Sequence, residues 1–143
     1  TEGAKADQLL VRALAAGAPH IEMNGGEVFK FATRVMVDSS QRTLARAGLA
    51  ATDVDWWVPH QANQRIIDHA VRRLGIDPAR VLTNLDRYGN TSAASIPLCL
   101  AEAWEAGHVR TGDRLMLVGF GAGLTWGSFL TTWAGPGVTE VAP

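Results

Sequence analysis

Short apolar runs alternate with helical apolar stripes along the 143 residues of this chain. Apolar residues recur at helical spacing in three segments, where we expect helices: 27–47, 66–74 and 93–106. Continuous apolar runs predict four strands, with a glycine-rich turn at 119–123 before the last: 54–58, 80–85, 114–118 and 124–133. Strands that alternate with helices favour a mixed sheet covered by helices, so we expect an α/β fold.

Turn-forming residues divide the chain into three parts. Residues 1–20 are rich in alanine and contain Gly17-Ala18-Pro19, so we expect a loop-rich lead-in. Residues 21–134 hold the predicted helices and strands, and 135–143 have the composition of a flexible tail. The first residues show neither an initiator Met nor a signal-peptide pattern, which leads us to expect a segment of a longer polypeptide.

Composition excludes several classes of protein. The chain is 47% hydrophobic and 19% charged, which is typical of a globular protein. Its net charge of -1 predicts no bulk attraction to nucleic acid. A single Cys provides no internal disulfide and favours a reducing, cytoplasmic compartment. No apolar run approaches the roughly 18 residues of a membrane span.

A His and an Asn each follow an apolar run and precede small residues that can begin a helix. His60 stands in Val58-Pro59-His60-Gln61-Ala62-Asn63, and Asn90 stands in Gly89-Asn90-Thr91-Ser92. Two neutral hydrogen-bond donors placed in this way can stabilise negative charge that develops on a carbonyl oxygen. Neither segment contains a nucleophile, so we interpret the pair as half of an active site.

Each of these two residues also has a purely structural interpretation. The His60 ring would be satisfied by a backbone carbonyl, and Asn90 would be a helix cap or turn residue. We favour function for the pair because ligand-facing residues of α/β sheets tend to lie between a strand and a helix. Gly121-Ala122-Gly123 offers backbone N–H groups as further donors, although hairpins need glycine for turns as well. We interpret Cys99, inside an apolar helical stretch, as a packing residue.

Cationic residues gather on the polar faces of two predicted helices. The first helix carries Lys30 and Arg34, and the second carries Arg65, His69, Arg72 and Arg73. Such patches suit phosphates or an acidic partner protein, although a single cation is more often simply solvated. The His and acidic residues show no metal-ligand spacing, so we expect no metal site.

Four longer segments carry a more specific pattern. They are Gly-Gly-Glu-Val-Phe-Lys at 25–30, Trp-Val-Pro-His-Gln-Ala-Asn at 57–63, Asp-Arg-Tyr-Gly-Asn-Thr-Ser-Ala-Ala-Ser-Ile-Pro at 86–97 and Gly-Phe-Gly-Ala-Gly-Leu-Thr-Trp-Gly at 119–127. In this order they resemble β-ketoacyl-acyl-carrier-protein synthase III over nearly all of residues 20–133. The resemblance implies a thiolase-like fold of two similar βαβαβαββ halves. This chain is similar to the C-terminal half, which would be a mixed five-stranded sheet covered by helices.

The resemblance also implies a reaction. In that family a Cys of the N-terminal half is acylated by an acyl-CoA, malonyl on the carrier protein decarboxylates, and the carbanion attacks the acyl thioester. His60 and Asn90 match the family's His and Asn, so both would hydrogen-bond the malonyl thioester oxygen. Phe120 and Gly121 would shape the malonyl pocket, and the N–H of Ala122 would complete an oxyanion hole with the absent Cys.

Partners follow from the same resemblance. Contacts to CoA and pantetheine would fall on Gly25, Phe29, Ala62 and Asn63. The acyl carrier protein would dock on Lys30, Arg65, Arg72 and Arg73. The chain would work with the N-terminal half that carries the Cys, in a homodimer of the full enzyme. Acyl-CoA and malonyl-carrier protein would be substrates, and no further cofactor is expected.

Two alternatives remain open from the sequence. The first is an acyltransferase of secondary metabolism, since some relatives with this architecture transfer acyl groups to oxygen or nitrogen. The condensation itself would serve either fatty-acid initiation or a secondary pathway such as polyketide priming. A non-catalytic subunit that only binds the carrier protein would fold alone and need no catalytic partner. Half of such a layered fold would leave an apolar face uncovered, so we expect the isolated chain to aggregate.

Overall fold

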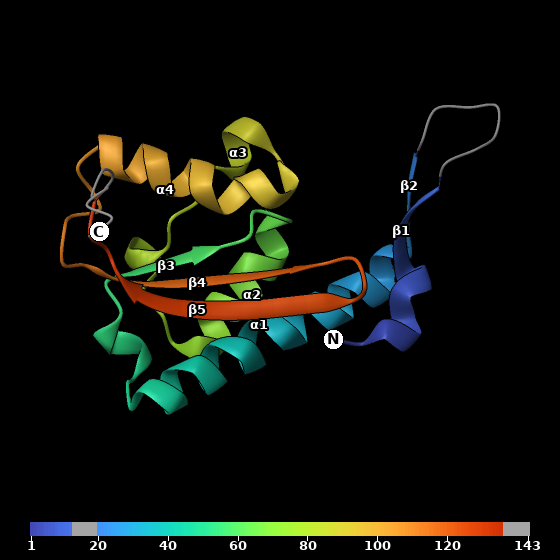
Figure 1. The fold of residues 1–143 in the computed structure, drawn as a ribbon, viewed down its shortest axis with the longest axis horizontal. Helices are drawn as coiled ribbons and strands as arrows, with labels where there is room; N and C mark the ends of the chain where they lie inside the picture. Colours follow the sequence, from blue (N-terminus) through green and yellow to red (C-terminus); the bar gives the residue numbers. More distant parts are fainter. Residues whose placement is uncertain (13–19, 136–143) are drawn as a thin grey trace, which may run out of the picture.

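A computed structural model describes residues 1–12 and 20–135 of the chain (Figure 1). Its centre is a sheet whose three strands lie in the order β3 (Trp56–Pro59), β4 (Arg114–Gly121) and β5 (Thr125–Thr132). β3 runs parallel to β4, and β5 runs antiparallel to β4. The predicted α/β class with a mixed sheet is confirmed.

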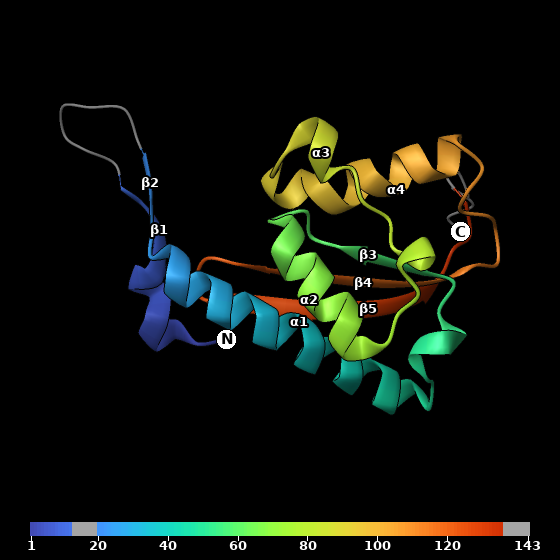
Figure 2. The ribbon, with the colours of Figure 1, turned by 180° about the vertical axis from the view of Figure 1, so that it is seen from behind.

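Helices cover both faces of this sheet (Figures 1 and 2). One face carries α1 (Gly25–Ala47) and α2 (Gln64–Leu74), and the other carries α4 (Ser95–Glu105) with the short α3 (Leu85–Tyr88). The three long helices lie where the apolar stripes predict them. Four short 3-10 helices complete the described part of the chain: η1 (Gly3–Gln8), η2 (Ala51–Asp53), η3 (Pro78–Arg80) and η4 (Ser92–Ala94).

The alternation of side chains along β4 divides the core between the two helical layers. Met116 and Val118 pack in the cluster that includes Ala32 of α1 and Ile67 of α2. Leu115, on the opposite face, packs in the cluster that includes Cys99, Leu100 and Ala103 of α4. Successive strand residues point to opposite faces, so one buried strand serves both layers.

The segment predicted as a strand over 80–85 forms only one bridge to the sheet, between Val81 and Trp57. The N–H of Leu82 donates to the carbonyl of Trp57. The next backbone groups of this segment bond to the side chain of Gln61 and not to a strand. Gln61 donates to the carbonyl of Leu82 and accepts from the N–H of Asn84. The buried amide of Gln61 thus takes the place of a neighbouring strand, and the chain then turns into α3.

The remaining two strands form a separate hairpin rather than part of the central sheet. β1 (Leu9–Arg12) pairs antiparallel with β2 (His20–Met23), and the hairpin extends beyond the end of the sheet (Figure 1). The expected lead-in therefore contains regular structure. The central sheet of the described residues has three strands and not the five that the resemblance implies. The loop predicted at 17–19 and the tail over 136–143 lie outside the described residues.

The glycine-rich turn between the last two strands is shorter than expected. β4 continues through Gly119 to Gly121, which pairs with Thr125, so the turn occupies only the residues between them. Gly123 has a φ of +130°, and a Cβ there would lie 2.6 Å from the Thr125 Cγ2. An L-residue is strained in that conformation, which explains the glycine at this position.

Candidate functional site

His60 directly follows β3, as the apolar run before it predicts. Its N–H donates to the carbonyl of Val118 at 2.8 Å, which extends the parallel pairing by one residue. The edge of its ring meets the ring of Phe120, with centroids 5.5 Å apart. Burial lowers the pKa of the His60 imidazole below its ordinary value of 6.5. His60 is therefore a neutral, half-buried imidazole at neutral pH.

The first residue of α4 holds this imidazole from behind. The Nδ1 of His60 lies 2.6 Å from the Oγ of Ser95, and the N–H of Gln61 donates to the same oxygen at 3.2 Å. Within the described residues, the Nε2 of His60 has no hydrogen-bond partner. One ring nitrogen is thus anchored and the other is available to a ligand.

Asn90 lies in the loop between α3 and η4. It follows a helical turn rather than the strand that the sequence predicts, and Gly89 before it has a φ of +65°. The Oδ1 of Asn90 accepts the N–H of Ser92, whose φ of +53° is uncommon for a residue other than glycine. Asn90 thus uses its side-chain oxygen to stabilise the turn. Its amide N–H donors have no partner in the part of the chain that is described.

Within the described residues, no hydrogen bond joins His60 and Asn90. The loop that carries Asn90 leads through η4 into Ser95, the residue that bonds His60. Both donors therefore belong to segments that converge on the start of α4. This convergence agrees with the expectation that His60 and Asn90 belong to one site. The catalytic roles of the two residues stay a prediction.

Phe120 connects His60 with α1. Its ring packs edge-to-face on Phe31 of α1, with centroids 6.2 Å apart, in addition to its contact with His60. Gly121 ends β4 next to it, and Ala122 is exposed in the turn, where its carbonyl accepts the Thr125 hydroxyl at 2.9 Å. The predicted malonyl-pocket residues thus begin at His60 and continue into the β4–β5 turn.

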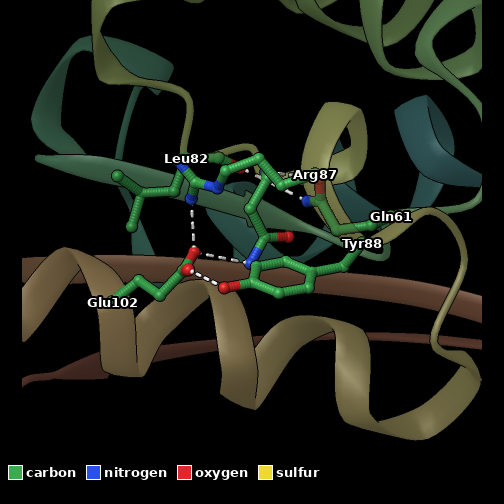
Figure 3. A network of polar contacts seen from close by, with 6 residues as sticks. Gln61, Leu82, Arg87, Tyr88 and Glu102 are labelled. Atoms are coloured by element: carbon green, nitrogen blue, oxygen red, sulfur yellow. Dashed lines mark hydrogen bonds and ion pairs between the residues drawn. The ribbon is translucent and has the colours of Figure 1, made fainter.

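A polar network that the sequence interpretation missed connects α4 with α3, the helix just before the Asn90 loop (Figure 3). Glu102 of α4 accepts hydrogen bonds from Asn84 at 2.8 Å, from the Tyr88 hydroxyl at 2.7 Å and from the Arg87 guanidinium. Buried Gln61 binds the backbone of Asn84, so the network extends from α4 to the residue after His60. The signal in the sequence is weak: Glu102 is one of two carboxylates, with Glu105, in a helix of mostly apolar residues.

The residues expected to contact CoA and pantetheine lie where α1 and α2 begin. Gly25 is the first residue of α1, and Ala62 and Asn63 precede α2. Asn63 caps α2 by accepting the N–H of Arg65 at 2.9 Å. Phe29 is half-buried under the Arg65 guanidinium, whose Cζ lies 5.3 Å from the ring centroid. The starts of the two helices thus meet through one cation–π contact.

The expected carrier-docking cations are exposed, but they are not equivalent. Lys30 pairs with Glu27 at 2.9 Å, and this interaction raises the pKa of the Lys30 amine. Arg65 stacks on Phe29, whereas Arg72 and Arg73 stand in the last turn of α2 and make no ion pair within the described residues.

Cys99 lies in the apolar core, as the sequence predicts for a packing residue. It is 3% exposed, and burial raises the pKa of its thiol to about 11. A thiol with that pKa is almost entirely protonated at neutral pH, so Cys99 is not a nucleophile. Among the residues that the structure describes, no group of His, Cys, Asp and Glu is arranged to hold a metal ion. The same residues include no helix long and apolar enough to cross a membrane.

Known proteins are similar to this chain in sequence and in fold. The β-ketoacyl-[acyl-carrier-protein] synthase III 2 of Deinococcus radiodurans is 56% identical over 119 residues, which cover 82% of this chain and 35% of that protein. The synthase III structure from Thermus thermophilus matches with a TM-score of 0.86 and 50% identity over 94% of this chain and 44% of that one. The priming β-ketosynthase of the R1128 polyketide pathway matches with a TM-score of 0.85 and 33% identity over 95% of this chain and 43% of that one.

The sequence profile of one family covers most of the fold and the site. The family described as 3-oxoacyl-[acyl-carrier-protein (ACP)] synthase III C terminal matches residues 44–133, which include His60, Asn90 and Phe120. The chain spans about a third of the length of its curated relative. The chain belongs to the 3-oxoacyl-[acyl-carrier-protein] synthase III C-terminal family.

Proposed function

We propose that this chain is the decarboxylation half of a β-ketoacyl-acyl-carrier-protein synthase III. The observation that carries the proposal is the geometry of His60, whose ring is anchored at Nδ1 and free at Nε2 within the described residues. Asn90 lies on the loop that leads to the same anchor, and its amide donors have no partner among the residues that the structure describes. The reaction would be a decarboxylative Claisen condensation of an acyl-CoA primer with malonyl-acyl carrier protein.

The two donors would act on the malonyl thioester. Its carbonyl oxygen would accept hydrogen bonds from the Nε2 of His60 and the amide of Asn90. Cleavage of the bond to the carboxylate releases CO2 and leaves the electron pair on an enolate, whose charge lies on that oxygen. The carbanion form then attacks the acyl thioester and expels the Cys thiolate. A donor aimed at developing charge in a site of low polarity typically contributes about 3 kcal/mol.

The nucleophile would come from an N-terminal half. Cys99, the one Cys of the chain, is buried and protonated, so it cannot carry the acyl group. The face of the sheet that carries α4 also has an exposed apolar residue. Phe129 of β5 pairs with Leu117 of β4, which packs against the α4 cluster, and Phe129 is 62% exposed. A second half-domain on this face would cover Phe129 and bring a Cys to His60. We refer to this chain together with such a half as the assembled enzyme. We propose that two copies of the assembled enzyme form a homodimer.

The thioester substrates would enter between the starts of α1 and α2. Phe29 and Arg65 form one wall there. A Cβ at Gly25 would meet nothing within 4 Å, so the backbone at Gly25 borders open space that a pantetheine arm would occupy. The exposed cations of α2, Arg72 and Arg73, suit the acidic surface of a carrier protein.

The proposal is tested on the assembled enzyme with an acyl-CoA and a malonyl thioester. We expect intact-mass spectrometry to show one acyl group on the N-terminal half and none on this chain. Addition of malonyl-carrier protein should then release CO2 and yield a ketoacyl product. The Cys99→Ser variant is the matched control and should behave like the unaltered enzyme. Acylation of this chain, or an absence of CO2 release, would refute the proposal.

A second candidate is the same chemistry in polyketide priming. It is favoured by one observation, the match to the R1128 priming β-ketosynthase over 95% of the chain. The two candidates differ in the carrier protein and primer that are used, so rates with a fatty-acid carrier and with a polyketide carrier separate them.

A further inference from the structure

The hydroxyl of Ser95 is the buried contact behind His60. Ser95 is 1% exposed and stands at the first position of α4. Its Oγ lies 2.6 Å from the Nδ1 of His60 and accepts the backbone N–H of Gln61 at 3.2 Å. Within the described residues, Ser95 has no other hydrogen-bond partner.

These two contacts determine where the proton lies. A serine hydroxyl has one proton to donate, and the Gln61 N–H already uses its oxygen as an acceptor. If the Nδ1 of His60 carried a proton, the oxygen would accept twice and the Ser95 O–H would be buried without an acceptor. A buried donor without a partner is unfavourable. Donation from Ser95 to the bare Nδ1 satisfies both groups, and the imidazole proton then resides on Nε2.

The surroundings of His60 keep it neutral, so its tautomer matters. Phe120 packs on the ring and Gly119 lies next to the His60 Cβ, and neither residue carries a charge. Burial alone lowers the pKa of His60. A neutral imidazole has one proton, and only the Nε2–H form can donate toward the open side of the site.

We propose, building on the function assigned above, that Ser95 is a positioning residue that holds His60 as the Nε2–H tautomer. His60 is then a hydrogen-bond donor to the malonyl thioester oxygen and not a base that removes a proton from the substrate. Ser95 itself touches no substrate and acts through the imidazole. The motif Asn90-Thr91-Ser92-Ala93-Ala94-Ser95 thus supplies a donor at its start and the anchor of the other donor at its end.

The tautomer is measured directly by ring ¹⁵N NMR of the assembled enzyme labelled with ¹⁵N-histidine. The His60→Gln variant identifies the signals of His60. We expect the ring proton on Nε2 and a bare Nδ1 at neutral pH. In Ser95→Ala we expect mixed tautomers, and in Ser95→Thr, which keeps the hydroxyl, the Nε2–H form. A proton on Nδ1 in the unaltered enzyme, or an unchanged pure Nε2–H form in Ser95→Ala, would overturn the proposal.

A kinetic test separates positioning from general loss of structure. Ser95→Ala should lower kcat for malonyl-CoA decarboxylation about fivefold near pH 8, because one net hydrogen bond is lost. The defect should shrink as the pH falls below the pKa of His60, since the imidazolium carries a proton on both nitrogens. The matched control is Ser40→Ala, which removes an equally buried hydroxyl that has no partner in the described residues of the structure.

The outcomes distinguish the two proposals. A Ser95→Ala defect that is independent of pH, or an equal defect in Ser40→Ala, would overturn the positioning role. An unaltered assembled enzyme that decarboxylates no malonyl-CoA would refute the proposed function. The NMR result would still decide whether Ser95 sets the tautomer, because that readout needs no activity.

Discussion

The Tyr88 hydroxyl donates a hydrogen bond of 2.7 Å to the carboxylate of Glu102, and this contact joins α3 to α4 two residues before Asn90. Arg87 and Asn84 donate to the same carboxylate (Figure 3). Glu102 therefore fixes the segment from which the Asn90 loop begins.

Replacing Glu102 should destabilise this segment in a pH-dependent way. Hydrogen bonds from Tyr88 and Asn84, and then Arg87, lower the pKa of Glu102 below its ordinary value of 4.5. A lowered carboxyl pKa contributes stability above pH 4.5 that is lost as the pH falls through the folded-state pKa. Glu102→Gln should thus lower the melting temperature of the assembled enzyme near pH 7, and the difference should shrink as the pH falls below 4.5. A difference that stays constant over this range would contradict the assignment.

Burial of neutral His60 predicts that stability falls on mild acidification. The unfolded chain binds a proton near pH 6.5, whereas the folded chain binds it only at a lower pH. Stability should therefore decrease as the pH falls below 6.5 and level off below the folded-state pKa. His60→Gln should remove this component from the melting temperature measured between pH 7.5 and 5. An unchanged pH dependence in His60→Gln would show that burial of His60 has no such effect.

Gly123→Ala should destabilise the β4–β5 turn. The φ of +130° and the 2.6 Å approach to the Thr125 Cγ2 strain any side chain there. Strain of this kind is typically about 1–3 kcal/mol. Gly127→Ala is the control, since a Cβ at Gly127 meets nothing within 4 Å and its φ is not positive. Chemical denaturation measures the free energy of unfolding of both variants. An equal loss of stability in the two variants would contradict the predicted strain at Gly123.

The exposed Phe129 predicts that the isolated chain self-associates. Its side chain is 62% exposed on the α4 face of the sheet, and Leu98 of α4 is 41% exposed. We expect sedimentation of the isolated chain to show aggregates, and Phe129→Ser to reduce them. Addition of the N-terminal half should give the same effect by covering the face. A soluble monomer that melts cooperatively would contradict the need for a partner.

Local patterns predict the elements of this fold better than they predict how the elements pair. The stripes of α1, α2 and α4 and the runs of β3, β4 and β5 are visible in the sequence because burial imposes their periods. The failure at 80–85 has a tertiary cause, since Gln61 takes the backbone groups that a strand would use. The hairpin of β1 and β2 joins segments that are close in the chain, but the alanine-rich composition of residues 1–20 predicts a loop there.

In the candidate site, too, local patterns predict the position of a residue better than its contacts with distant parts of the chain. The apolar run over 54–58 predicts a strand just before His60, and the structure confirms it with β3, which ends at Pro59. The contact between His60 and Ser95 spans 35 residues and is invisible to any local pattern. The catalytic roles of His60 and Asn90 remain proposals from their resemblance to the family and their free donors.

The donor roles of His60 and Asn90 are tested by measuring the two half-reactions of the assembled enzyme separately, in His60→Ala and in Asn90→Ala. Acylation of the N-terminal Cys by acyl-CoA should proceed as in the unaltered enzyme. Decarboxylation of malonyl-CoA should slow by roughly 100-fold to 1,000-fold in each variant, as expected for loss of one donor to an oxyanion. Equal loss of both half-reactions, or normal decarboxylation in either variant, would contradict the assignment of these two residues as the donors.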